Sequence, residues 1–145
     1  MNTLKLINEG SYKLKQSDII SYQLDSEILL SKVLNITREN LLINLEQNID
    51  RKNVKKFERL IHRRSLNEPM AYILKKKEFW SRTFEVNNDT LIPRPETELM
   101  VEKLVYIYKQ KKINILDIGT GSGCILISLL SELKKSKGVG IDISN

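Results

Sequence analysis

Hydrophobic positions in the first seventy residues recur every three or four residues, the spacing that places side chains on one face of a helix. The clearest segment follows Asp50, where Val54, Phe57, Leu60 and Ile61 are separated by lysine, glutamate and arginine. A stripe of this kind usually packs into a protein core. The pattern therefore predicts a bundle of short helices in this part of the chain.

Polar residues ahead of the apolar runs indicate where these helices begin. Asp25 and Ser26 stand just before one run, and Thr37 and Asp50 stand before two others. Side-chain oxygens of Ser, Thr and Asp accept hydrogen bonds from the free N–H groups of a first helical turn. We expect all three sites to be helix starts, and we expect Pro69 to close the helix that follows Asp50.

The character of the sequence changes after residue 75. Residues 78–80 and 83–86 are rich in aromatic and β-branched side chains, with Ser81-Arg82 between them, and a polar Asn-Asn-Asp run ends the segment at residue 89. Two such runs with a short connection predict a β-hairpin.

The last third predicts a strand, a loop, a helix and a second strand. Residues 113–118 are a short apolar run, and residues 119–123 read Gly-Thr-Gly-Ser-Gly. Apolar residues at helical spacing follow over 124–133, and a second short strand covers 138–141. This order is the opening of a doubly wound α/β sheet.

The glycine loop and the acid after the second strand predict a nucleoside site. Glycine lets a ligand approach the main chain, and the following helix offers free N–H groups at its positive end. Asp142 lies 21 residues after Gly121, close to the spacing of about 20 that places an acid at a ribose in such units.

The residues in and around the loop narrow the choice of ligand class. Cys124 stands where a dinucleotide fingerprint requires glycine, and the Lys-Ser/Thr pair of a phosphate-binding P-loop is missing from the loop. Asp117, just before the loop, suits a ligand with a positive group such as an ammonium. S-adenosylmethionine combines an ammonium group with a nucleoside. The alternative is a purely structural glycine turn. We expect Cys124 to be a small buried helix residue and not a nucleophile.

Composition sets the broad class. The chain has 145 residues, of which 41% are hydrophobic and 29% are charged, as in a soluble globular protein. It contains one cysteine, no run of about 18 apolar residues and no signal-peptide core, so we expect a cytoplasmic protein without disulfides or a membrane span. The net charge is +6, but the lysines form short scattered clusters, which favours an ordinary solvated surface over a dedicated nucleic-acid-binding stripe. His62 stands alone, so we do not expect a metal site.

Two motifs resemble a known family. Residues 91–98 read Leu-Ile-Pro-Arg-Pro-Glu-Thr-Glu and residues 116–123 read Leu-Asp-Ile-Gly-Thr-Gly-Ser-Gly, as in the peptide chain release factor glutamine methyltransferases, the HemK/PrmC family. Further matching segments occur in the order that the family shows, at residues 25–30, 63–64, 68–73 and 78–80. The resemblance thus covers nearly the whole chain, and it corresponds to the N-terminal portion of the family.

This resemblance implies an α/β fold in three parts. Residues 1–74 would be an N-terminal helical bundle that recognises the substrate, and residues 75–92 would be a β-hairpin linker. Residues 93–145 would begin a Rossmann-like sheet of the class I S-adenosylmethionine-dependent methyltransferases, which is truncated here.

The family's site residues carry over as follows. The loop would line the methionine and adenosine parts of S-adenosylmethionine, with Asp142 on the ribose hydroxyls and with Thr97 and Arg94 against the cofactor from the other side. The loop residues are Gly119, Thr120, Gly121, Ser122 and Gly123. The family's Asn-Pro-Pro-Tyr motif, which grips the substrate amide, does not occur in these 145 residues. We therefore expect no catalytic residue in this chain and no activity from this chain alone.

The implied function is methylation of the side-chain amide of a glutamine in peptide chain release factors. The release factors would be the protein partners, and the basic charge also allows proximity to the ribosome. Two alternatives stay open: a methyltransferase that acts on adenine amino groups in nucleic acid, and a non-catalytic interaction fragment. The helical region ahead of the Arg-Pro-Glu-Thr-Glu motif favours the protein substrate.

Overall fold

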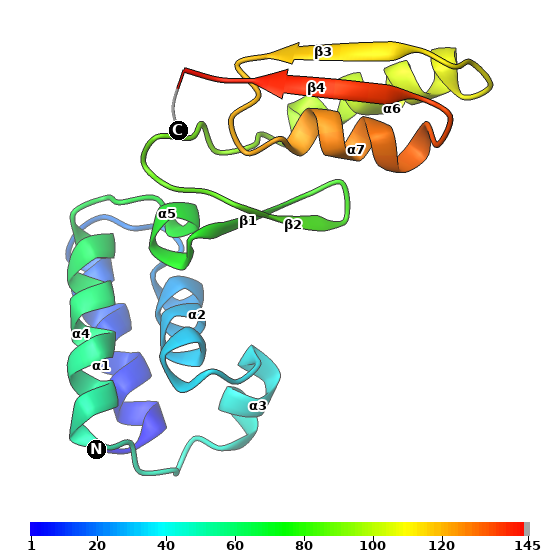
Figure 1. Ribbon diagram of the computed structural model, residues 1–145. Helices are drawn as coiled ribbons and strands as arrows, with labels where there is room; N and C mark the ends of the chain where they lie inside the picture. The colour runs from blue at the N-terminus through cyan, green and yellow to red at the C-terminus, as the bar shows by residue number, and fades with distance from the viewer. Residues whose placement is uncertain (144–145) are drawn as a thin grey trace. The chain divides into compact units, whose positions relative to one another are not determined.

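The structure, a computed structural model, describes residues 1–143 and divides the chain into two compact units (Figure 1). The first unit is Met1–Leu74 and the second begins at Lys75. No helix in the described residues is long and apolar enough to cross a membrane. Each unit is described separately below.

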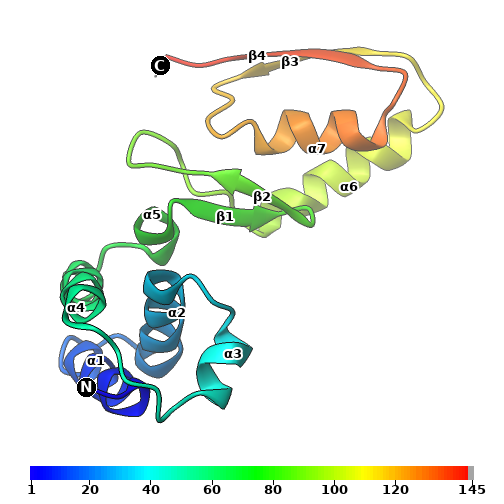
Figure 2. The ribbon, with the colours of Figure 1, turned by 60° about the horizontal axis from the view of Figure 1, so that its bottom comes forward.

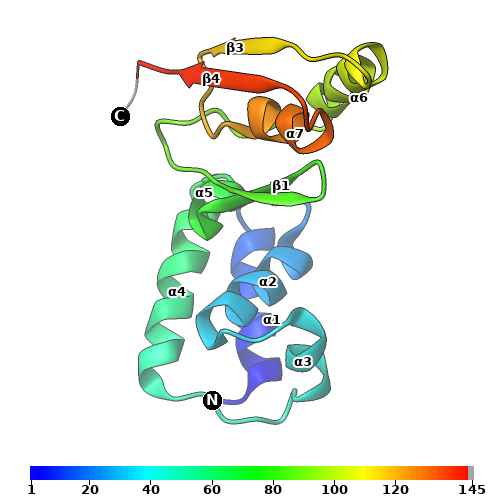
Figure 3. The same cartoon turned by 45° about the vertical axis from the view of Figure 1, so that its right-hand side comes forward.

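The first unit is helical. In the described chain it consists of α1 (Thr3–Lys15), α2 (Tyr22–Leu34), α3 (Arg38–Ile43), α4 (Arg51–Ser65) and α5 (Met70–Leu74). Helices α1, α2 and α4 pack against one another, as Figures 1 and 3 show. Their shared core is made of buried aliphatic side chains and Phe57.

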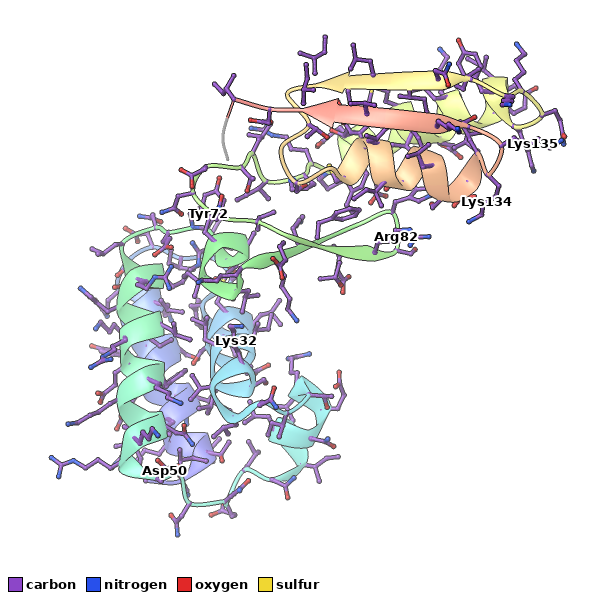
Figure 4. All side chains as sticks on the ribbon, viewed as in Figure 1. Lys32, Asp50, Tyr72, Arg82, Lys134 and Lys135 are labelled. Atoms are coloured by element: carbon purple, nitrogen blue, oxygen red, sulfur yellow. The ribbon has the colours of Figure 1, made fainter. Side chains whose placement is uncertain are left out.

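Two of the expected helix starts are confirmed. The Thr37 hydroxyl accepts a hydrogen bond of 3.2 Å from the Asn40 amide at the start of α3. The Asp50 carboxylate accepts one of 2.9 Å from the Asn53 amide at the start of α4, where Figure 4 labels it. The same N–H bond holds the pKa of Asp50 below its usual value, because it favours the charged form.

The expected helix start at Asp25–Ser26 is wrong. Helix α2 already begins at Tyr22, and both side chains are buried inside the unit. Asp25 forms an ion pair with Arg64, with 2.7 Å between Oδ2 and Nε, and Ser26 donates a hydrogen bond of 2.9 Å to the Ile7 carbonyl. A local pattern cannot distinguish a capping carboxylate from one that a distant arginine pairs.

Helix α4 also ends earlier than Pro69 suggested. Its last residue is Ser65, and Asn67 takes a left-handed conformation with φ of 64° just after it. Asparagine tolerates this conformation, which commonly ends helices. The turn is held by Arg63, whose Nε donates a 2.7 Å hydrogen bond to Glu68.

The second unit contains two small sheets and two helices. Its elements are β1 (Lys76–Phe79), β2 (Arg82–Glu85), α6 (Glu96–Tyr108), β3 (Asn114–Ile118), α7 (Cys124–Glu132) and β4 (Lys137–Ile141). Strands β1 and β2 are antiparallel, and β3 and β4 are parallel with Leu116 opposite Val139. This arrangement confirms the α/β class: a helical unit, a hairpin and the beginning of a parallel sheet.

The hairpin turn lies one residue earlier than expected. Phe79 pairs with Arg82, so Trp80 and Ser81 form the turn and both have positive φ, 51° and 53°. Two-residue hairpin turns of type I′ need positive φ at both positions, which asparagine and glycine adopt most easily. Here carboxylates from the helices hold the turn: Glu98 accepts the Trp80 amide at 2.8 Å, and Glu132 accepts its indole N–H at 3.1 Å.

Both helices of the second unit lie on the same side of the parallel strands, as Figures 1 and 2 show. Buried residues from the hairpin and from both helices form its core: Phe79, Phe84, Val101, Cys124 and Leu129. The opposite face of the strands carries exposed aliphatic side chains, among them Ile118, which is 75% exposed. Parallel sheets normally bury both faces. In this sheet the helices cover only one face of the described strands.

Candidate cofactor-binding loop

The glycine loop and Asp142 meet at the carboxyl ends of the two parallel strands. The loop leaves β3 and Asp142 follows β4, so the parallel pairing puts both at one edge. The Gly119 and Thr120 amides donate hydrogen bonds of 2.8 and 3.0 Å to the Ile141 carbonyl. Open α/β sheets bind ligands at this edge.

The loop adopts a backbone that glycine favours. Gly119, Gly121 and Gly123 have φ of 75°, 53° and 74°, a region that other residues seldom adopt. A Cβ placed on Gly119 or Gly121 would meet no atom within 4 Å. The space beside the main chain is therefore open, and it is available to a ligand that approaches the backbone.

Two carboxylates hold the loop in place. Asp142 accepts a hydrogen bond of 2.7 Å from the Gly121 amide, and Asp117 accepts one of 2.9 Å from the Thr120 hydroxyl. Both acids lie near the N-terminus of α7, where the helix dipole is positive and favours negative charge. The structure brings together the loop and the two acids that the sequence singled out, and the hydrogen bonds between them carry no sequence signal.

The expected loop residue Ser122 adds a polar side-chain atom to the site. Its hydroxyl oxygen is buried and has no hydrogen-bond partner in the described structure. Buried polar atoms are nearly always paired, so an unpaired one in a loop of this kind is unusual. The open backbone and this hydroxyl fit a polar ligand such as a nucleoside.

Two strand glycines were also missed by sequence reasoning. A Cβ on Gly138 would lie 2.4 Å from Leu126 Cδ1, and a Cβ on Gly140 would lie 2.8 Å from Thr120 Oγ1. The first glycine lets α7 pack closely on β4, and the second leaves room for the loop. Glycine inside a strand often marks such an approach, so a signal was present.

Arg94 and Thr97, the expected site residues outside the loop, have no bond to it in the described structure. Arg94 and Thr97 lie at the start of α6, where the Thr97 amide bonds the Arg94 carbonyl at 3.0 Å. Among the described residues, no hydrogen bond joins either side chain to the glycine loop. Cys124 is buried at the first position of α7, as expected. The residues that the structure describes contain no group of three or more His, Cys, Asp or Glu that could hold a metal ion.

A family model of known proteins matches most of the helical unit. Residues 5–74 match the family model of the PrmC N-terminal domain. These residues are therefore similar to the PrmC N-terminal domain. The resemblance to release factor glutamine methyltransferases that the sequence motifs indicated is thereby confirmed.

Similarity extends beyond the PrmC N-terminal domain. The chain is 44% identical to a release factor glutamine methyltransferase of Buchnera aphidicola subsp. Acyrthosiphon pisum over 144 residues, which is 99% of the chain and 51% of that protein. It is 34% identical to one of Nitratidesulfovibrio vulgaris over 96% of the chain and 47% of that protein. It is also 38% identical to a bifunctional methyltransferase of Rickettsia bellii, over 97% of the chain and 30% of that protein.

The chain spans about half the length of the release factor glutamine methyltransferases that it matches. The matched half includes the helical unit, the hairpin, the glycine loop and both parallel strands. These relatives are methyltransferases, a class that in general takes a methyl donor of the S-adenosylmethionine type.

Proposed function

We propose that the chain carries the substrate-recognition domain and the cofactor loop of a protein-glutamine N-methyltransferase that uses S-adenosylmethionine. Its substrates would be peptide chain release factors, and it would act in the cytoplasm and near ribosomes. The observation that carries the proposal is the open glycine loop bonded to Asp142 at the end of two parallel strands. The names of the relatives support the substrate class and do not favour a nucleic-acid methyltransferase.

In this proposal residues 119–123 hold the methionine and adenosine parts of the cofactor, and Asp142 accepts hydrogen bonds from the ribose hydroxyls. Asp117 supplies negative charge for the ammonium group, and Arg94 and Thr97 approach from the start of α6. When bound, S-adenosylmethionine supplies a methyl group activated by a positively charged sulfur.

The three parts of the chain would divide the work. Residues 1–74 would recognise the release factor, residues 75–92 would link, and residues 93–145 would hold the cofactor. An amide nitrogen is a poor nucleophile, so the reaction needs groups that orient it and stabilise charge on its carbonyl. We assign that task to no residue of this chain.

Asp142 provides the test of the cofactor site. A hydrogen bond to a charged acceptor contributes about 1.5–3 kcal/mol, and about 1.4 kcal/mol corresponds to a tenfold change in affinity. We expect Asp142→Ala to weaken S-adenosylmethionine binding by roughly ten- to a hundredfold in calorimetric titration. Asp142→Asn keeps an oxygen for the Gly121 amide but loses the charge, so its affinity should be intermediate.

Asp89→Ala is the matched control, because it removes an exposed carboxylate from the turn that follows β2. It should leave the affinity unchanged. Parent-like affinity in Asp142→Ala would show that the ribose assignment is wrong. A parent chain that binds no S-adenosylmethionine would contradict the assignment of the glycine loop itself.

A further inference from the structure

Two lysine clusters that are far apart in the sequence meet at the other end of the parallel strands. One precedes β3 and the other joins α7 to β4. Backbone pairing brings them together: the Lys137 amide bonds the Ile113 carbonyl at 3.1 Å, and the Ser136 hydroxyl accepts the Ile113 amide at 3.3 Å. Figure 4 labels Lys134 and Lys135 at this end of the unit. We call the six residues the lysine patch: Lys109, Lys111, Lys112, Lys134, Lys135 and Lys137.

The lysine patch is exposed and unneutralised. All six side chains are solvent-exposed, and none has an ion-pair partner among the residues that the structure describes. Residues 103–116 and 133–141 contain no aspartate or glutamate at all. The Lys111 ammonium group lies 5.2 Å from the centre of the Tyr108 ring, a contact that leaves its charge in place. Six like charges on one small edge produce a strong local field.

The sequence alone favoured an ordinary solvated surface, because the lysine clusters are separate along the chain. Since the fold joins two of these clusters, we infer that the lysine patch binds the phosphate backbone of nucleic acid. Phosphate groups need only positive charge on flexible stems, which lysine supplies without a fixed hydrogen-bond geometry. Protein interfaces, by contrast, are depleted in lysine and depend on aromatic, methionine and arginine anchors. Contacts to phosphate carry no sequence information, so binding through the patch should be largely independent of nucleotide sequence.

This inference is independent of the proposed methyltransferase function. The patch lies at the amino ends of the strands and the glycine loop lies at their carboxyl ends. Five residues of β3, at about 3.3 Å each, separate the two by about 16 Å. Nucleic acid on the patch would therefore leave the loop accessible, and S-adenosylmethionine should not compete with it.

The test compares the chain with a charge-neutralised variant and a matched control. The patch variant changes four lysines to glutamine: Lys111, Lys112, Lys134 and Lys135. The control removes four exposed charges in the same way from α4 of the other unit: Lys52, Lys55, Lys56 and Arg59. A third variant changes the four patch lysines to arginine, which keeps their charge. Circular dichroism checks that each variant is folded.

Binding is measured by fluorescence anisotropy with labelled duplex RNA and duplex DNA of one sequence. The salt concentration is varied from about 50 to about 200 mM, a range over which binding through phosphate contacts weakens strongly. We expect the patch variant to bind at least about tenfold more weakly, with a salt slope smaller by about three to four, since each phosphate contact adds about 0.9. The arginine variant should bind like the parent, and the α4 control should lose less than about threefold.

Several results would overturn the inference. Equal losses in the patch variant and the α4 control would show that net charge alone causes the binding. Parent-like affinity in the patch variant would place the binding elsewhere. Equal or tighter binding to phosphatidylglycerol vesicles or to polyglutamate would assign the patch to a membrane or to an acidic protein instead.

Discussion

Gly10 on α1 allows three helices to pack closely, and replacing it should destabilise the first unit. A Cβ at this position would lie 2.6 Å from Ser26 Oγ, 2.7 Å from Phe57 Cζ and 3.0 Å from Ile61 Cδ1. These atoms belong to α2 and α4, so one added methyl group meets two neighbouring helices at once. Ser26, Phe57 and Ile61 are themselves fully or almost fully buried, which leaves them little room to move.

Opposing effects determine the size of the change in Gly10→Ala. Alanine in a helix interior is favoured over glycine by about 1 kcal/mol, which would stabilise the variant. Forcing a methyl group into a packed core costs about 1–3 kcal/mol. Moving Ser26 also endangers its 2.9 Å hydrogen bond to the Ile7 carbonyl, and an unpaired buried group costs about 1–3 kcal/mol. We therefore expect a net loss of roughly 1–3 kcal/mol in the free energy of unfolding.

Urea unfolding followed by far-ultraviolet circular dichroism measures this loss. Ser11→Ala is the matched neighbour: its buried hydroxyl has no partner in the described structure, so removing it should be neutral or stabilising. Phe57→Leu shortens the side chain at the clash, so Gly10→Ala should cost less in that background. A Gly10→Ala chain more stable than the parent by about 1 kcal/mol would refute the packing argument, since only helix propensity would then matter.

Three further predictions concern pH, order and activity. Hydrogen bonds from Arg63 hold the pKa of Glu68 below its ordinary 4.5, so the stability that Glu68 contributes is present above pH 4.5 and lost as the pH falls below it. Glu68→Gln should make the free energy of unfolding less dependent on pH in this range, and an unchanged pH dependence would contradict this. Hydrogen exchange should show stronger protection in α1, α2 and α4 than in residues 113–141, where the strand face is uncovered; equal protection would refute this. The chain alone should transfer no labelled methyl group from S-adenosylmethionine to a release factor, and transfer above background would show that it contains an amide-binding group.

Local rules predicted the local features of the fold. Thr37 and Asp50 cap their helices through amides three residues ahead, which is an interaction that the sequence displays directly. Asp25 resembles such a cap, but its partner is Arg64, 39 residues away. Burial next to an arginine from another helix is a tertiary event, and no spacing in the sequence reports it. The propensity argument therefore fails where a distant charge decides the outcome.

The hairpin illustrates the same limit. Trp80 and Ser81 are poor candidates for a turn that needs positive φ. The sequence pattern therefore predicted the turn one residue later, at Ser81-Arg82. The observed turn is held by Glu98 and Glu132, which come from α6 and α7. In the loop, by contrast, the glycine spacing and Asp142 were readable because strand, turn and helix follow one another without interruption.

Acidic side chains lie at one end of the strand–helix–strand unit and lysines lie at the other end, and the direction of α7 explains part of this separation. Helix α7 runs antiparallel to its strands, so its positive end lies beside the acids Asp117 and Asp142 and its negative end lies beside Lys134 and Lys135. Dipole complementarity explains one or two charges at each end, worth about 0.3–1 kcal/mol apiece. It does not account for six lysines in two stretches, residues 103–116 and 133–141, that each contain no acid. The excess positive charge at that end is what favours an external anion, whereas each acid at the other end already has a hydrogen-bond donor in the loop.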